Sequence, residues 1–122
     1  MKIERGDILI ADLGRIPDTS IQSGVRPVVV ISNDKANTYS PVLTVVPVTS
    51  KIYKKRYLPT HVILTYMDAP GIGRYSLALA EQVTSIATSS VGKKIGKVRP
   101  EALARIIQAV EVQIGVIERE RF

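Results

Sequence analysis

The first half of the chain is made of short apolar runs that have the spacing of β-strands. "GDILIADL" (6–13) alternates between apolar and polar residues enough for a strand, and "RPVVVISN" (26–33) and "PVLTVVPVTS" (41–50) are β-branched runs bounded by turn-forming residues. We expect these three segments to form a central sheet.

The second half continues with short strands and then changes its period. "THVILT" (60–65) predicts another strand, "YMDAPGIGRYS" (66–76) predicts a hairpin loop before "LALAEQVTSI" (77–86), and "SVGKKIGKVR" (90–99) predicts a short edge strand. From Pro100 onward, apolar residues recur on one helical face, with Pro100 at a first-turn position that tolerates its missing N–H. Arg99 is a poor N-cap because its side chain has no acceptor. We expect one C-terminal helix, its apolar face formed by Leu103, Ile106, Ile107, Val110, Ile114 and Ile117.

Many short strands with hairpin-length connections and one final helix indicate a mainly β fold. The pattern favours a small antiparallel barrel or a strongly bent sheet over a βαβ arrangement. A chain of 122 residues fits one domain, so we expect residues 1–122 to form a single domain. Small barrels often work through the loops at their rims, which directs attention to the strand ends.

Composition limits where the protein can be located and which cofactors it can bind. No stretch of roughly 18 apolar residues is free of charge, which argues against a membrane span. Charged residues also interrupt the first apolar run, unlike a signal peptide, so we expect a cytoplasmic protein. The chain contains no cysteine, and no His/Asp/Glu cluster has the spacing of metal ligands, so we expect no metal and no cofactor.

The net charge of +6 is concentrated in two windows that contain basic residues and no acidic ones. These windows are "KIYKKR" (51–56) and "KKIGKVR" (93–99), which we interpret as loops or strand ends. Basic clusters attract polyanions through counterion release, so RNA, DNA or an acidic protein segment are candidate partners. Solvated lysines that only aid solubility are an equal alternative for either window. Tyr53 and Tyr57 can stack on unpaired bases, or can pack their own loop against the domain.

Arg26 lies where a flexible turn meets a stiff strand. Ser23 and Gly24 precede it, and Pro27 biases it toward an extended conformation, so its guanidinium is held at a strand mouth. The structural alternative is an arginine that binds carbonyls or pairs with Asp12 or Asp34.

Thr49 ends the third predicted strand, two residues after Pro47. A proline inside such a run predicts an edge strand or a bulge, and bulges commonly re-aim a side chain at a site. Ordinary β propensity also accounts for a threonine at this position.

Five segments in order, taken together, resemble the MazF/PemK family of toxin endoribonucleases of type II toxin–antitoxin systems over residues 5–117. These segments are "RGDILIADLG" (5–14), "SGVRPVVVISND" (23–34), "NTYSPVLTVVPVTSKI" (37–52), "LPTHVIL" (58–64) and "LAEQVTSI" (79–86). The resemblance implies an SH3-like barrel of the type shared by the MazF and CcdB toxins and a homodimer. It also implies cleavage of single-stranded RNA at short sequence motifs without a metal.

The resemblance assigns the family's catalytic arginine to Arg26 and its catalytic threonine or serine to Thr49. In metal-free cleavage the ribose 2′-hydroxyl attacks phosphorus and yields a 2′,3′-cyclic phosphate and a 5′-hydroxyl. A held guanidinium and a hydroxyl donate hydrogen bonds to the phosphoryl oxygens of the transition state. The general base is not assigned, because Ile21 and Gln22 occupy the turn in which some members carry a glutamate. His61 is the only histidine, and we expect a structural role for it.

Further site residues come from the two loops near Arg26 and Thr49. Ser20 and Gln22 can hydrogen-bond a phosphate or a base, and the first basic window adds RNA-binding candidates: Lys51, Tyr53, Lys54, Lys55 and Arg56. Loops 14–22 and 51–57 should carry the base specificity, but their sequence does not state which motif is cut. Glu81 and Gln82 are expected to be mainly structural. An acidic, disordered segment of a cognate antitoxin is the expected protein partner, lying across the basic rim.

Two non-catalytic alternatives share the same fold. A gyrase poison of the CcdB type acts through a C-terminal stretch that contains tryptophan, and this chain has no tryptophan. A nucleic-acid-binding or scaffold relative would bind without turnover and would be indifferent to the loss of Thr49.

Overall fold

The computed structural model describes residues 1–15, 19–51 and 58–118. Within these residues the strands are β1 (Asp7–Asp12), β2 (Val25–Val30), β3 (Val42–Thr49), β4 (His61–Leu64), β5 (Ser76–Leu79), β6 (Thr84–Ala87) and β7 (Val91–Lys97). The helices are α1 (Asp34–Tyr39) and α2 (Pro100–Gln113), and two 3₁₀ turns are η2 (Ala80–Gln82) and η3 (Thr88–Ser90). In the part of the chain so described, no helix has the length and apolar character needed to cross a membrane.

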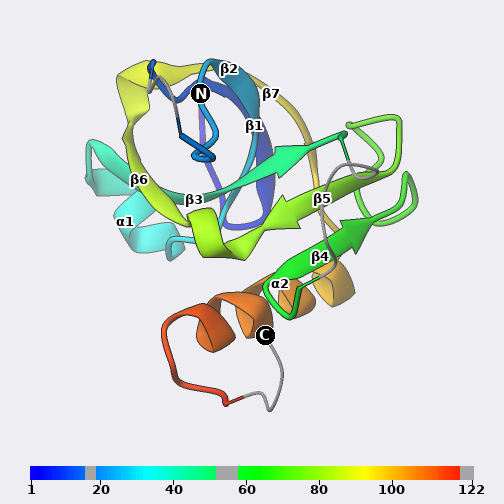
Figure 1. The fold of residues 1–122 in the computed structure, drawn as a ribbon. Coiled ribbons are helices and arrows are strands. Elements are labelled where there is room, and N and C mark those ends of the chain that lie inside the picture. Colours follow the sequence, from blue (N-terminus) through cyan, green and yellow to red (C-terminus); the bar gives the residue numbers. More distant parts are fainter. Residues whose placement is uncertain (16–18, 52–57, 119–122) are drawn as a thin grey trace.

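The strands form one antiparallel sheet in the order β4-β5-β3-β2-β1-β7, and β6 pairs with β3 as well. Strands β1, β2, β3, β6 and β7 curl into a barrel, while β4 and β5 extend from it over α2 (Figure 1). The mainly β class with a C-terminal helix is confirmed. The three strands predicted from the first half lie side by side in the middle of the sheet, as expected.

The central strands bury both of their faces, which explains why their sequences are continuous apolar runs. Alternate side chains on a strand point to opposite faces. One face fills an inner cluster of Leu9, Ala11, Val28, Val30, Leu43, Val45 and Ile86. The other face packs toward α2 in an outer cluster that includes Ile8, Val29, Val46, Val48, Ala102, Ile106 and Ala109.

Helix α2 begins at Pro100 as predicted, and the Arg99 side chain makes no capping hydrogen bond. The helix ends at Gln113, so the prediction that Ile114 and Ile117 continue its buried face is wrong. Gly115 follows with a φ of 82°, a left-handed conformation that ends helices readily when the residue is glycine. Ile114 is consequently 63% exposed.

A second helix, α1, was not predicted, so the expectation of a single helix is wrong. Asn33 caps α1 by accepting a hydrogen bond from the Ala36 backbone N–H. Asparagine is among the preferred N-caps, and this was the available signal. Asn33 therefore caps a helix and does not end the strand predicted over residues 26–33.

Pro47 lies in an interior strand, so the prediction of an edge position or a bulge in this strand is wrong. It pairs with Val28 of β2 in regular register. The irregularity lies on the side of β3 away from β2. There β6 pairs with β3 up to Val45 and β5 pairs with it from Val48 onward. The 3₁₀ turn η2 connects β5 to β6 at this break. This break accommodates a residue that has no N–H to donate.

Residues 93–96 of the second basic window lie inside strand β7, and the rest of the window forms the end of this strand and the two residues after it. The prediction of a loop or strand end is therefore wrong for Lys93 and Lys94 and correct for Lys97 and Arg99. Lys94 Nζ lies 2.9 Å from Asp7 Oδ2 and donates to the Lys2 carbonyl at 2.6 Å. Lys97 Nζ lies 3.7 Å from Glu4 Oε1. Two of the lysines in this window therefore tie β7 to the N-terminal segment.

Candidate functional site

Arg26 and Thr49 lie near each other at one end of the β2–β3 pair. The register joins Val28 to Pro47, and Arg26 and Thr49 each lie two residues further along their own strands, where both line the same two hollows. Both residues belong to the strand face that carries Val28 and Val45 of the inner cluster, so they stand at the mouth of the barrel interior. Thr49 is buried, with 2% of its surface exposed, and Arg26 is half-buried.

The Arg26 guanidinium is oriented by one hydrogen bond to the backbone. Its Nε donates to the Ser23 carbonyl at 2.7 Å. Among the described residues it forms no ion pair with Asp12 or Asp34. Asp12 instead accepts from the Gly14 N–H, and Asp34 accepts from the Arg5 N–H, which is the main reason that the Asp34 pKa lies below its ordinary value. Of the structural roles considered for Arg26, the structure shows binding to one carbonyl, that of Ser23, and no pairing with Asp12 or Asp34.

Arg26 and Thr49 line a hollow of about 300 Å³ together with the loop that precedes β2. The other lining residues are Thr19, Ser20, Ile21, Gln22, Ser23 and Lys51. The structure therefore brings together five of the predicted site residues. The remaining candidates, Tyr53, Lys54, Lys55 and Arg56, lie outside the described residues.

A second hollow, of about 180 Å³, also has Arg26 and Thr49 in its wall. Its lining comprises Val25, Arg26, Pro27, Val48, Thr49, Ser50, Ile72, Arg74 and Ser76. Sequence reasoning missed Arg74 because it assigned "PGIGR" to a hairpin turn, and a turn assignment does not say which strand end the turn approaches.

Gln82 holds the loop that forms one wall of the first hollow. Its Oε1 accepts from the Gln22 N–H at 2.6 Å, and its Nε2 donates to the Ser20 carbonyl at 3.0 Å. Gln82 belongs to η2, the turn at the break between β5 and β6. These two hydrogen bonds agree with the structural role expected for Gln82. They position the backbone of Ser20 and Gln22.

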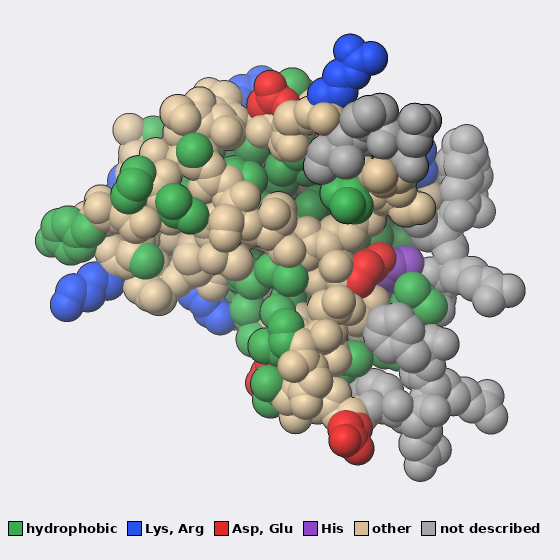
Figure 2. Space-filling model, turned by 60° about the vertical axis from the view of Figure 1, so that its left-hand side comes forward, with side chains coloured by type: hydrophobic (Ala, Val, Ile, Leu, Met, Phe, Trp, Pro, Cys, Tyr) green, Lys and Arg blue, Asp and Glu red, His purple; other side chains and the backbone are tan. Residues whose placement is uncertain are grey.

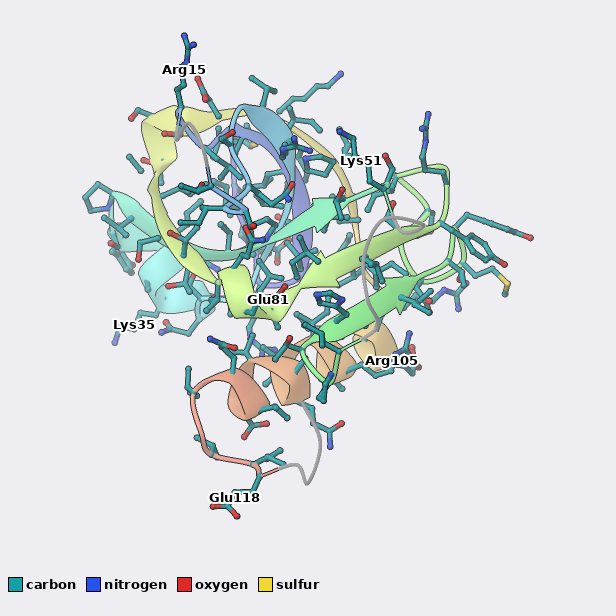
Figure 3. The ribbon with its side chains drawn as sticks, viewed as in Figure 1. Arg15, Lys35, Lys51, Glu81, Arg105 and Glu118 are labelled. Atoms are coloured by element: carbon teal, nitrogen blue, oxygen red, sulfur yellow. The ribbon has the colours of Figure 1, made fainter. Side chains whose placement is uncertain are left out.

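His61 lines neither of the two hollows and is paired with Glu81. Its Nε2 lies 2.8 Å from Glu81 Oε2, and the residue is 4% exposed. Figure 2 shows a histidine beside an acidic side chain on a face whose Lys and Arg side chains stand mainly at its margins. In Figure 3, Glu81 lies apart from Lys51, which follows two residues after the end of β3. The contacts of His61 agree with a structural role.

The two hollows are basic, and their described linings include no aspartate, glutamate or histidine. No group of three or more potential metal-ligating side chains occurs among the residues that the structure describes. Guanidinium, ammonium, hydroxyl and amide donors converge there, and these are the groups that bind phosphate oxygens. The arrangement is suited to hold a phosphodiester and to stabilise negative charge that develops on it.

Comparison with known proteins places this geometry in context. Residues 4–114 match the family model described as PemK-like, MazF-like toxin of type II toxin–antitoxin system. The chain is 36% identical to Endoribonuclease EndoA of Bacillus subtilis over 120 residues, which cover 97% of this chain and 99% of that protein. It is 30% identical to Endoribonuclease MazF of Staphylococcus saprophyticus over 114 residues, covering 93% of this chain and 92% of that protein.

Solved structures share the fold at lower identity. The crystal structure of MazF from Deinococcus radiodurans aligns with a TM-score of 0.78 at 20% identity, over 94% of this chain and 98% of that chain. An endoribonuclease in complex with its cognate antitoxin, from Mycobacterial species, aligns with a TM-score of 0.72 at 20% identity, over 97% of this chain and 98% of that chain. These likenesses show the shared fold, including the SH3-like barrel that was expected.

Proposed function

The chain belongs to the family of PemK-like, MazF-like toxins of type II toxin–antitoxin systems, and we propose that Arg26 and Thr49 are the catalytic residues of its endoribonuclease activity on single-stranded RNA. One observation carries the assignment: the two residues lie at neighbouring strand ends at the mouth of the barrel and share the walls of two basic hollows. A phosphodiester that spans the hollows would pass directly over both side chains.

The reaction that fits these side chains is attack by the RNA's own 2′-hydroxyl. Its oxygen forms a bond to phosphorus and loses its proton, and the bond to the 5′-oxygen breaks as that oxygen gains one. The products are a 2′,3′-cyclic phosphate and a 5′-hydroxyl. Arg26 and Thr49 donate hydrogen bonds to the phosphoryl oxygens as negative charge builds on them. The protein's contribution is charge stabilisation and alignment, with no metal required.

Substrate binding extends from this pair into the first hollow. Ser20 and Gln22 line it with a hydroxyl and an amide, and Lys51 adds a positive charge. The backbone around Ser20 and Gln22 is held by Gln82, so these groups meet the RNA in a defined arrangement. Tyr53, Lys54, Lys55 and Arg56 follow directly in the sequence and remain part of the proposed RNA-binding set.

The proposal includes two protein partners and a location. A toxin of a type II system has a cognate antitoxin, and an acidic disordered segment would be attracted to the basic rim and would cover Arg26. A second copy of the chain forms a homodimer, as the family resemblance implies. We place the protein in the cytoplasm, because there it meets messenger RNA and its antitoxin.

The test is cleavage of an end-labelled, diverse pool of single-stranded RNA in the presence of a chelator. Wild-type protein should cut at discrete positions and leave cyclic phosphate ends, and Arg26→Ala and Thr49→Ala should each abolish cutting. Lys35→Ala and Thr38→Ala are matched controls, because both side chains are exposed on α1 and line neither hollow. RNA binding without cleavage by the wild-type protein would favour the non-catalytic alternative.

A further inference from the structure

The loop between β4 and β5 brings a basic residue to a second hollow beside Arg26 and Thr49, distinct from the one lined by the proposed RNA-binding loop. Arg74 lines the second hollow, which shares Arg26 and Thr49 with the first, while Lys51 lines the first hollow only. Each of the two hollows therefore has one further positive side chain besides Arg26. The side chain of Arg74 is exposed, and no acidic residue lies in the described lining of the second hollow.

The start of this loop is fastened to helix α2. Asp68 Oδ2 accepts hydrogen bonds from the Thr65 N–H at 3.0 Å and from the Thr65 hydroxyl at 3.1 Å. The same oxygen lies 3.2 Å from Arg105 Nη2, and the Asp68 carbonyl accepts from the Arg99 N–H at 2.9 Å. These contacts give the loop a fixed origin.

The middle of the loop lies directly on strand β7. Gly71 is so close to β7 that a Cβ at this position would collide with the carbonyl oxygen of Ile95. A Cβ on Gly96 would likewise crowd the Cα of Gly71. Two facing glycines permit this backbone approach. The loop between β4 and β5 is consequently held at a second point, three residues before Arg74.

The end of the loop is tied to the strand that carries Thr49. Arg74 precedes β5, where the buried Ser76 hydroxyl donates to the Arg74 carbonyl at 3.3 Å. Leu77 of β5 then pairs with Thr49 itself. The backbone of Arg74 is therefore positioned relative to Thr49 by a strand pairing, while its side chain is exposed.

We propose that Arg74 binds a phosphate next to the scissile one, so that the RNA runs from the first hollow across Arg26 and Thr49 into the second. This inference rests on the proposed function and deepens it, because it assigns a path to the substrate and a residue to a neighbouring nucleotide. Arg74 is a substrate-binding residue and not one that acts on the reacting atoms. Arginine suits this role because its guanidinium fork matches phosphate oxygens.

The first test compares Arg74→Ala with the wild-type protein on an RNA whose cut site has been mapped. A contact made equally to substrate and transition state should raise KM about five- to tenfold and leave kcat within about twofold. Binding to the same RNA with a 2′-deoxy scissile nucleotide should weaken by the same factor, and its dependence on log salt should become shallower by about 0.7. Arg74→Lys should recover part of the affinity, since it keeps the charge.

The second test locates the phosphate. RNAs that carry one neutral methylphosphonate, on either side of the scissile phosphate, are compared with the unmodified RNA. One of the two should weaken wild-type binding about as much as Arg74→Ala does, and Arg74→Ala should be insensitive to that modification, because the two changes remove the same contact. Lys35→Ala, with the same loss of charge on the distant helix α1, should show neither effect.

The possible results distinguish a failure of the Arg74 inference from a failure of the proposed endoribonuclease function. If the wild-type protein cuts RNA, Arg26→Ala and Thr49→Ala do not, and Arg74→Ala binds with wild-type affinity and salt dependence, the inference about Arg74 is overturned while the proposed function stands. A loss of kcat with unchanged KM would also overturn it, since that pattern belongs to a catalytic residue. If the wild-type protein does not cut RNA, the proposed function has failed, and with it this inference.

Discussion

Arg26 near the start of β2 and Thr49 at the end of β3 line the same two hollows, with no direct hydrogen bond between their side chains. Their relative position comes from backbone pairing, because Val28 and Pro47 fix the register two residues away. Arg26 is further held by the Ser23 carbonyl, and the Thr49 Oγ1 accepts from the Lys51 N–H at 3.2 Å. Donors that are positioned before substrate arrives need no rearrangement during the reaction, which is the condition for strong electrostatic stabilisation.

The first prediction concerns the geometry of the arginine. Arg26→Lys keeps the positive charge but loses the planar fork and the Nε that binds Ser23. We expect its single-turnover rate of RNA cleavage to fall by about 100-fold or more, the usual scale for losing an oriented donor to the transition state. Thermal unfolding should change little, because Arg26 is only half-buried. A lysine variant with near wild-type rate would show that charge alone is sufficient.

The second prediction concerns the threonine hydroxyl. Thr49→Val removes the hydroxyl at nearly constant volume and is expected to slow cleavage about 100-fold or more. Thr49→Ser keeps the hydroxyl and should retain most of the rate. Because Thr49 is buried, both variants need a measured free energy of unfolding beside the rate. Equal rates for the valine and serine variants would rule out a role for the hydroxyl.

The third prediction concerns the nucleophile. An RNA with a single 2′-deoxy substitution at the mapped cut site should bind to the wild-type protein with nearly unchanged affinity and should not be cut. The reason is that the attacking oxygen belongs to the substrate. The same substitution one nucleotide away serves as the control and should permit cleavage. Continued cutting at the modified site would contradict the mechanism.

The fourth prediction concerns the loop that carries Ser20 and Gln22. Gln82→Ala removes both hydrogen bonds that hold this loop. We expect KM for RNA to rise about three- to tenfold, because the loop must then be ordered on binding. The free energy of unfolding should fall by about 1–2 kcal/mol for the two lost hydrogen bonds. Gln113→Ala, at an exposed amide at the end of α2, should change neither quantity.

The fifth prediction concerns pH and the anchor of the β4–β5 loop. Hydrogen bonding from the Thr65 backbone, with help from Arg105, lowers the pKa of Asp68 below its ordinary value of 3.8. The native state therefore binds fewer protons than the unfolded state at acidic pH. Stability from Asp68 should be fully present above about pH 4 and should be lost as pH falls through the lower, native pKa.

Asp68→Asn tests this with urea unfolding between about pH 2.5 and pH 7. The variant should be less stable than the wild-type protein at neutral pH by about 1 kcal/mol, a value kept small because the ion pair with Arg105 is partly exposed. The difference should shrink as the pH falls below about 4. A difference that stays constant over this range would contradict the assignment to the charge of Asp68.

Local pattern was enough to identify much of this fold. One alternating segment and two β-branched runs form the central strands, and the change of period at Pro100 marks the start of α2. Arg26 and Thr49 could be selected because strand ends, a following proline and the family-like segments around them are all local features. The short helix α1 is not predicted from the sequence pattern, although Asn33, a preferred N-cap residue, precedes it.

The sequence by itself thus determined the mainly β class, the central strands and the pair of residues proposed for catalysis, because these depend on periodicity and on segments read one at a time. Only the tertiary structure decided that Pro47 sits opposite a break in its partner strand, that Lys94 pairs with Asp7, and that Arg74 lies beside Arg26. Each of these depends on which distant segments become neighbours, and that is set by strand register and by the close approach of Gly71 to β7, which no local pattern encodes.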